Sequence, residues 1–218
     1  MMAAVLVAAS VVASGGILGA SSVAAKKASP PSCFPNCQGA NLAGYSYKKV
    51  DLSDGNFSQS DVDETSFKKS NLTGANFQGA SGNSPHFADA NLTGANFTNV
   101  SFTNMSAAWG TGKSGAVFTN ANLTNANLSG AKLPWAYFNS ANLSGADFTG
   151  ASPSQSDFKK ANLTGANFTN ADLWNSNFKK ANLTNVNFTG ADLSQSKFKK
   201  AKFNNTTCPD GTVTNSGC

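Results

Sequence analysis

The chain has 218 residues, which is enough for one domain with a hydrophobic core of its own. Only 12% of the residues are charged, and all 16 basic residues are lysines. The lack of arginine argues against functions that need a planar, bidentate donor for phosphate, carboxylate or guanine. The net charge of +5 permits a weak attraction to anionic polymers or surfaces.

Residues 1–25 are apolar and small and carry no charge, and they end in Val23-Ala24-Ala25 before two lysines. This pattern predicts an export signal that is cleaved after a small residue, leaving no membrane span in the mature chain. An uncleaved anchor is the alternative, and a start further upstream would account for the missing basic residues. Residues 26–37 are predicted to be a linker that carries the first two cysteines.

A period of five residues dominates residues 38–207, as in ANLTG ANFTN ADLWN SNFKK from Ala161. We call the central Leu or Phe position i; position i−2 is small and position i−1 is usually Asn or Asp. Five matches neither the period of a helix nor that of a flat strand. A backbone that turns a corner every five residues would instead point every i side chain into one interior. Four such sides close a square of 20 residues, and Phe-Lys-Lys recurs at that interval from Phe158.

These repeats resemble the pentapeptide-repeat family, whose consensus is close to A(D/N)LXX. The resemblance implies an all-β fold, the right-handed quadrilateral β-helix of that family, with roughly seven to eight coils. Asparagines at i−1 are expected to form a hydrogen-bonded ladder along the axis, and Asn122, Asn142, Asn162 and Asn182 are examples.

The repeat is interrupted at two places. Gly82 occupies an i position and Pro85 the next i−2 position. Phe102 and Phe118 are separated by three repeats plus one residue, so residues 104–117 are predicted to contain an insertion that protrudes as a loop or bulge and carries Trp109. We therefore expect a first stack over residues 38–103 and a second over 118–207, in imperfect register. Pro153 replaces another i residue and predicts a milder distortion.

The four cysteines flank the repeats. Two local disulfides are expected, Cys33–Cys37 before the coils and Cys208–Cys218 in a C-terminal cap over residues 208–218. Cys37 and Cys208 are in register with position i and are expected to plug the ends of the core.

No catalytic constellation is visible. His86 is the single histidine, and the aspartates at i−1 occupy positions where asparagine substitutes for them. We predict that the chain is not an enzyme and needs no metal or cofactor. Members of the family that mimic DNA act on type II topoisomerases, but a basic, exported chain does not suit that role.

Lysine pairs and aromatic residues form the candidate binding surface: Lys159, Lys160, Lys179, Lys180, Lys199, Lys200, Trp135, Tyr137 and Trp174. Such a surface suits a glycan or a protein partner. Repeat duplication alone would also produce a solvated lysine stripe. Whether Lys48-Lys49 and Lys68-Lys69 share the face of the later pairs stays open, because the insertion separates them.

We therefore predict an exported, monomeric scaffold for an unknown protein partner, with no specific affinity for nucleic acid. The alternative is a binder of an anionic envelope polymer or glycan through the lysines and neighbouring tryptophans. A topoisomerase modulator and an ice-binding protein, the latter through the aligned Ser and Thr side chains at i+1, are less favoured.

Overall fold

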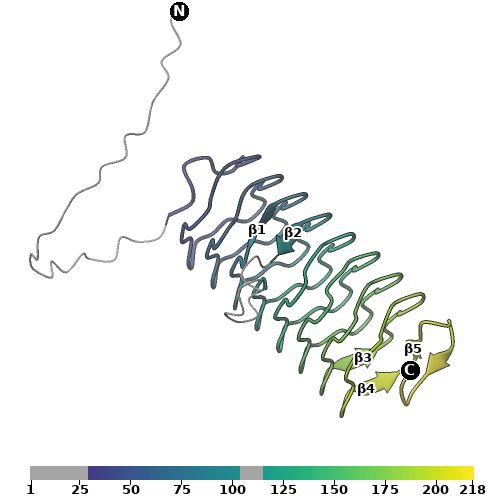
Figure 1. Cartoon of the computed structure of the whole chain (residues 1–218). Coiled ribbons are helices and arrows are strands. Elements are labelled where there is room, and N and C mark those ends of the chain that lie inside the picture. The colour runs from purple at the N-terminus through teal and green to yellow at the C-terminus, as the bar shows by residue number, and fades with distance from the viewer. Residues whose placement is uncertain (1–28, 104–114) are drawn as a thin grey trace, which may run out of the picture.

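The computed structural model describes residues 29–103 and 115–218, which wind into a rod of stacked coils (Figure 1). Parallel bridges join residues 20 positions apart, such as Asn142 with Asn162. One aromatic residue per coil marks the same side of the square, at positions 47, 67, 87, 118, 138, 158, 178 and 198. These positions count eight coils, in agreement with the predicted number.

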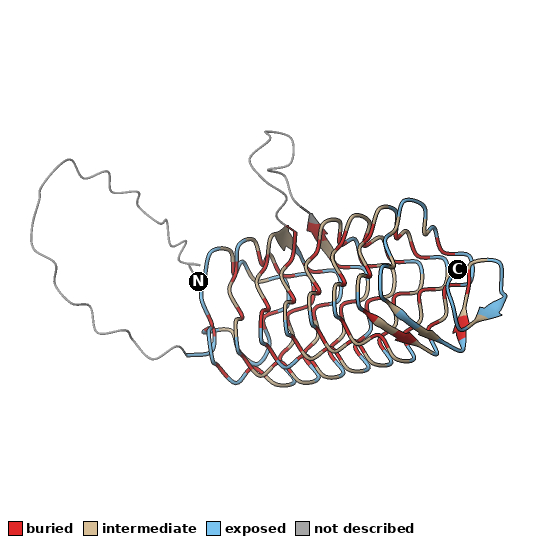
Figure 2. Cartoon of the chain, turned by 90° about the horizontal axis from the view of Figure 1, so that it is seen from below, coloured by how far each residue is buried: buried red, intermediate tan, exposed pale blue. Residues whose placement is uncertain are grey.

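Each side of the square has the same local structure, and residues 161–165 illustrate it. Ala161 and Leu163 are buried, whereas Asn162, Thr164 and Gly165 face outward to different degrees. The next repeat starts after a turn in which the N–H of Ala166 donates to the carbonyl of Leu163 at 2.9 Å. The residue at i+2, here Gly165 with φ of 70°, adopts the left-handed conformation that this turn requires. The alternation of buried and outward residues recurs along the rod (Figure 2).

Extended stretches long enough to count as strands are few, and the described residues contain no helix. β1 (Ser81–Asn83) pairs in parallel with β2 (Ser101–Thr103), and β3 (Asn182–Thr184) pairs in parallel with β4 (Lys202–Asn204). β5 (Thr206–Thr207) and β6 (Val213–Thr214) form an antiparallel pair at the C-terminal end. Elsewhere the coils are joined by single bridges, because each side turns after three residues.

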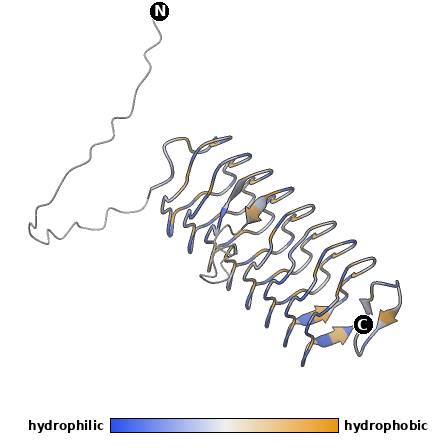
Figure 3. Cartoon of the chain, in the orientation of Figure 1, coloured by the Kyte–Doolittle hydropathy of each residue, from blue (hydrophilic) through white to orange (hydrophobic). Residues whose placement is uncertain are grey.

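Four columns of i side chains fill the core. Along the ribbon, hydrophobic residues recur at regular intervals in every coil (Figure 3). We number the faces 1 to 4 along the chain; face 1 begins at Leu42, face 2 at Tyr47, face 3 at Leu52 and face 4 at Cys37. Faces 2 and 4 carry mainly phenylalanine. The ring of Phe158 stacks on Phe138 and Phe178 at 4.8 and 4.9 Å and meets Phe168 of face 4 edge-on at 5.8 Å. Such pairs add about 0.5–1.5 kcal/mol each to the burial of the rings.

The insertion does not disturb the register of the stack. His86 bridges Val117 and Asn91 bridges Asn122, 31 positions apart instead of 20. This coil therefore holds eleven extra residues, the length of segment 104–114, and the interval from Phe102 to Phe118 is one repeat plus eleven rather than three plus one. The expectation of imperfect register is wrong, because the N–H of Phe87 still donates to the carbonyl of Val117 at 2.7 Å. The predicted loop with Trp109 lies outside the described residues.

The two smaller irregularities lie on face 1. Gly82 has φ of 153°, and a Cβ there would lie 2.6 Å from the backbone nitrogen of Asp63. Phe102, its partner in β2, is fully buried and packs against Phe97, so its ring occupies space beside a residue that has no side chain. Pro153 lacks an N–H and therefore cannot donate a backbone hydrogen bond to the next coil. The coils on either side of it continue without interruption.

Both predicted disulfides are present. Cys33 is bonded to Cys37 and Cys208 to Cys218, with Cα–Cα distances of 4.9 and 5.3 Å. Cys37 is 1% exposed and Cys208 5% exposed, and both occupy i positions of face 4 at opposite ends of the rod. The predicted export signal lies outside the described residues, and in the part that is described no helix is long and apolar enough to cross a membrane.

Candidate binding surface

The continuous register places all the lysine pairs on face 2. The N–H of Lys49 donates to the carbonyl of Lys68, and the N–H of Lys180 donates to the carbonyl of Lys199; equivalent bonds link every coil between them. We call this the lysine face. Its lysines are Lys48, Lys49, Lys68, Lys69, Lys159, Lys160, Lys179, Lys180, Lys197, Lys199 and Lys200. The early and late pairs therefore share one face, which the sequence alone left open.

Charge is strongly segregated on the rod. Of the lysines that the structure describes, only Lys132 and Lys202 lie on other faces. The acidic side chains on it are Asp89 and Asp157, and the remaining carboxylates are on the other three faces. A positive field therefore covers one side of a rod whose net charge is modest.

The lysine pairs form two blocks. The early block is Lys48, Lys49, Lys68 and Lys69, and the late block is Lys159, Lys160, Lys179, Lys180, Lys199 and Lys200. Coils that carry Ala88-Asp89, Thr119-Asn120 and Asn139-Ser140 at the same corner separate them. With coils about 4.8 Å apart, the gap from Lys69 to Lys160 is roughly 19 Å. An anionic partner that contacts both blocks must therefore extend along the axis.

The second lysine of each pair has an unfavourable backbone conformation. Lys160, Lys180 and Lys200 have φ of 62°, 62° and 63°. Glycine and asparagine adopt this left-handed conformation at a lower energetic cost, and they occupy the equivalent position on face 3, for example at Gly165 and Asn185. The turn itself therefore does not explain why lysine is present.

A groove runs beside the late lysine block at the corner between faces 1 and 2. It has a volume of about 220 Å³ and is lined by Trp135, Tyr137, Gln155, Ser156, Asp157, Asn175, Asn177 and Lys197. The structure thus brings together Trp135 and Tyr137, which the sequence had nominated. Trp174 is 42% exposed and does not line the groove. Lys197 was not predicted as a site residue, although a lysine at i−1, where asparagine is usual, was a usable signal.

Faces 3 and 4 present a different chemistry, because their polar groups bind one another. The Nδ2 group of Asn142 donates to Oδ1 of Asn122 at 3.3 Å and to Oγ1 of Thr124 at 2.9 Å. The Thr124 hydroxyl in turn donates to Oδ1 of Asn122 at 2.7 Å. Asn162 and Asn182 continue the ladder, as predicted. The hydroxyls that would form an ice-binding array are therefore engaged within the ladder.

The carboxylates at i−1 have a structural role in the turns. The hydroxyl and N–H of Ser194 donate to Asp192 and hold the pKa of its carboxyl below the usual range. Within residues 29–103 and 115–218, no group of three His, Cys, Asp or Glu side chains is placed to hold a metal ion.

His86 lies on the lysine face between Ser66 and Val117. Its Nδ1 atom is buried and has no hydrogen-bond partner among the described residues. Burial, followed by the nearby charges of Lys68 and Lys48, lowers the pKa of the imidazole below its ordinary value.

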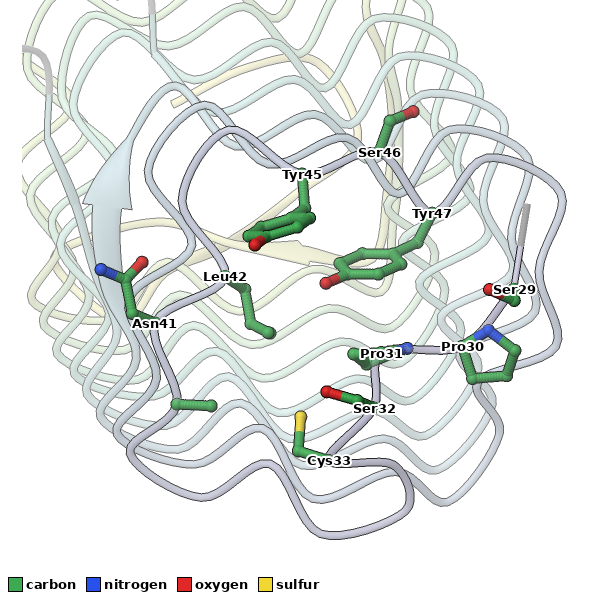
Figure 4. Close-up of a pocket in the computed structure, with 11 residues that line it drawn as sticks. Ser29, Pro30, Pro31, Ser32, Cys33, Asn41, Leu42, Tyr45, Ser46 and Tyr47 are labelled. Atoms are coloured by element: carbon green, nitrogen blue, oxygen red, sulfur yellow. The ribbon is translucent and has the colours of Figure 1, made fainter. Parts of the chain in front are cut away.

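The N-terminal end of the rod has a hollow of about 550 Å³ (Figure 4). Tyr45 and Tyr47 lie nearly parallel across it, with ring centroids 6.1 Å apart, and Tyr47 stacks on Phe67 at 5.7 Å. Leu42 and Pro31 line the same hollow. The tyrosines therefore extend the aromatic column of face 2 to the end of the rod.

Comparisons with known proteins agree with this architecture. The family model described as pentapeptide repeats matches residues 114–139, 136–175 and 166–205 in 8 copies, and the model described as a pentapeptide repeat region matches residues 32–107. None of the curated proteins searched matches the chain.

The chain is also similar to solved structures. Trypsin-treated QnrB1, a plasmid-mediated fluoroquinolone resistance protein, is 21% identical with a TM-score of 0.53, over 76% of this chain and 83% of that one. HetL, involved in heterocyst differentiation regulation in the cyanobacterium Nostoc sp. strain PCC 7120, is 22% identical with a TM-score of 0.29, over 82% and 91%. The likeness to QnrB1, at this level of identity, shows the fold alone. From its five-residue repeat, its right-handed quadrilateral coils and both family models, the chain belongs to the pentapeptide-repeat family.

Proposed function

We propose that this chain is an exported, non-enzymatic β-solenoid that serves as a scaffold for a protein partner. The contrast between the faces carries the proposal: faces 3 and 4 use their polar groups internally, whereas the lysine face presents charged side chains outward. Among the residues that the structure describes, these lysines have no carboxylate partner in an ion pair. Such a surface is available to a partner without loss of internal bonds.

Export is supported by the sequence of residues 1–25 and by the two disulfides, since disulfides persist in oxidising compartments. The test is to express the full chain in a host with an export pathway and to determine the N-terminus and thiol content of the product. We expect a chain that starts after Ala25 and has no free thiol. A cytosolic, full-length product with reduced cysteines would refute export.

The scaffold role is tested by crosslinking the exported protein in its native compartment. We expect a defined protein partner that is lost when Lys159, Lys160, Lys179 and Lys180 are replaced by glutamine. Replacement of Lys132 and Lys202, which lie on other faces, is the control and should leave the partner bound. Equal capture by both variants would show that the lysine face is not the docking surface.

A second function, binding of an anionic envelope polymer, is favoured by the alignment of the early and late lysine pairs on one face. The test is retention on an immobilised anionic polysaccharide as the salt concentration rises. We expect retention at low salt that is lost near physiological ionic strength or above, because exposed charges are screened. Lys→Gln changes in the three late pairs should abolish it, and no retention of the native chain at low salt would end this proposal.

A further inference from the structure

We propose that the groove at the corner between faces 1 and 2 is a binding site for a carboxylated polysaccharide whose chain runs along the axis of the rod. This inference rests on the second proposed function, the binding of an anionic polymer by the lysine face. It adds the chemical class of the ligand, the place where the ligand binds and the direction in which the ligand chain runs.

Two parallel columns of side chains form the walls of the groove. Trp135, Gln155 and Asn175 form one wall, since each takes the same i+2 position in successive coils of face 1. The other wall follows the bridges from Tyr137 to Asp157, then to Asn177 and Lys197. The groove therefore runs parallel to the axis across four coils, and its length is about 14 Å at 4.8 Å per coil.

Hydrogen bonds hold in place both the floor of the groove and the second wall, which contains Asp157 and Asn177. Ser156 is 1% exposed, donates to the carbonyl of Leu133 at 3.0 Å and accepts from the N–H of Ala136 at 2.9 Å. Oδ1 of Asp157 accepts from the N–H of Lys159 at 3.0 Å and from Nδ2 of Asn177 at 3.1 Å. A site whose groups are already held in position loses little entropy when it binds a ligand.

The chemistry of the wall changes along its length. The second wall begins with the aromatic ring of Tyr137, which lies at the same end as Trp135 of the first wall. It continues with the carboxylate of Asp157 and the amide of Asn177, and it ends with the ammonium of Lys197. Aromatic rings offer an apolar face to the C–H face of a sugar ring, while carboxylate and amide groups bond to its hydroxyls. The lysine suits a carboxylate on a later sugar residue, two coils or roughly 10 Å beyond Asp157.

The dimensions and surroundings favour a polymer over a small molecule. The volume of about 220 Å³ is below the roughly 300–1,000 Å³ of pockets that enclose drug-sized ligands, and the lining residues extend over four coils. Lys197 shares its face with Lys199 and Lys200, so the groove lies alongside the late lysine block, and an acidic chain bound in the groove lies within the positive field of that block.

Trp135 is also unusual in its backbone, with φ of 56°. A bulky aromatic side chain is uncommon in this conformation, and the equivalent residues of the next two coils are Gln155 and Asn175. Asparagine at position 135 is therefore compatible with the turn, and the variant Trp135→Asn removes the ring without straining the backbone.

The experiment measures binding of three probes to the full, disulfide-bonded chain by calorimetry at low salt: an oligogalacturonate, a polyphosphate of similar charge and a neutral cello-oligosaccharide. The variants are Trp135→Asn and Lys197→Asn, with Trp174→Ser as the matched control outside the groove. Unchanged thermal unfolding establishes that each variant is folded.

We expect Trp135→Asn to weaken oligogalacturonate about tenfold while polyphosphate changes by less than about twofold. Lys197→Asn should weaken oligogalacturonate as well, Trp174→Ser should change neither, and the neutral probe should bind more weakly than the acidic one. The groove proposal is overturned if Trp135→Asn leaves oligogalacturonate unaffected, or if the neutral probe binds equally well. In the first case the lysine-face function survives as long as both acidic probes bind the native chain. If neither acidic probe binds at low salt, both proposals fail.

Discussion

Faces 3 and 4 and the lysine face are built on the same five-residue turn, yet they differ in where their polar groups are used. On faces 3 and 4, asparagine and threonine bond to the coils above and below, as Asn162 does to Asn142 and Ser144. On face 2, the turn positions carry lysines that lie outside this ladder. The difference shows that the backbone requires only the buried i and i−2 residues and a tolerant residue at i+2. The outward positions are free either to reinforce the stack or to serve a partner.

A substitution in the core, which all four faces share, should have the largest effect on the free energy of unfolding. Phe158 is fully buried between the rings of Phe138 and Phe178. Phe158→Ala should lower the free energy of unfolding by about 3–5 kcal/mol, because the coils above and below prevent the cavity from collapsing. Urea denaturation measures the loss, and Tyr45→Ala, at an exposed end residue, is the control. A loss below about 1 kcal/mol would mean that the coils can repack.

A substitution in the asparagine ladder should have an intermediate effect on the free energy of unfolding. The same substitution outside the ladder, on the lysine face, should not have this effect. Asn162→Ala removes bonds to Asn142, Ser144 and Thr164 and should cost about 1–3 kcal/mol of unfolding free energy. Asn139→Ala on the lysine face makes the same chemical change at a position outside the ladder, and its cost should stay within about 0.5 kcal/mol. Equal losses in thermal or urea unfolding would remove the distinction between the faces.

Replacing the lysines at i+2 should change the free energy of unfolding only slightly, and towards higher stability instead of lower. The triple variant Lys160→Asn, Lys180→Asn and Lys200→Asn places a residue that tolerates φ near 60° at each turn and relieves repulsion between like charges. The free energy of unfolding should stay constant or rise by about 1 kcal/mol, while retention on an anionic polymer falls. A destabilised triple variant would indicate that these lysines support the fold.

The smallest expected effect is a pH dependence centred on His86. Its pKa in the folded chain is below the ordinary 6.5, since burial, Lys68 and Lys48 disfavour the imidazolium and Asp89 offsets this only in part. The folded state therefore binds the proton less well than the unfolded state, and stability present above about pH 6.5 is lost as the pH falls below it. The melting temperature should fall less between pH 7.5 and 5.0 in His86→Gln than in the native chain, and identical pH profiles would exclude this contribution.

Much of the fold follows from the sequence, because period five leaves a corner-turning coil as the arrangement that buries every i residue. The small residues at i−2 and the asparagine ladder follow from the same register. The pairing of Cys33 with Cys37 and of Cys208 with Cys218 follows instead from their closeness in the sequence at each end of the repeats. Trp135 and Tyr137 were also identified, as aromatic residues near the lysine pairs. The groove itself was not, since it depends on Asp157, Asn177 and Lys197, which come from three further coils.

The sequence by itself thus determined the repeating unit, the core and the closed ends, all of which depend on residues near one another in the chain or at a constant interval. Only the tertiary structure decided how the coils before and after the insertion align. Because the length of the insertion was unknown, counting in steps of 20 residues could not assign the later residues to a face. That alignment depends on hydrogen bonds between coils, such as the one from Phe87 to Val117. It places all the lysine pairs on a single face, beside the groove.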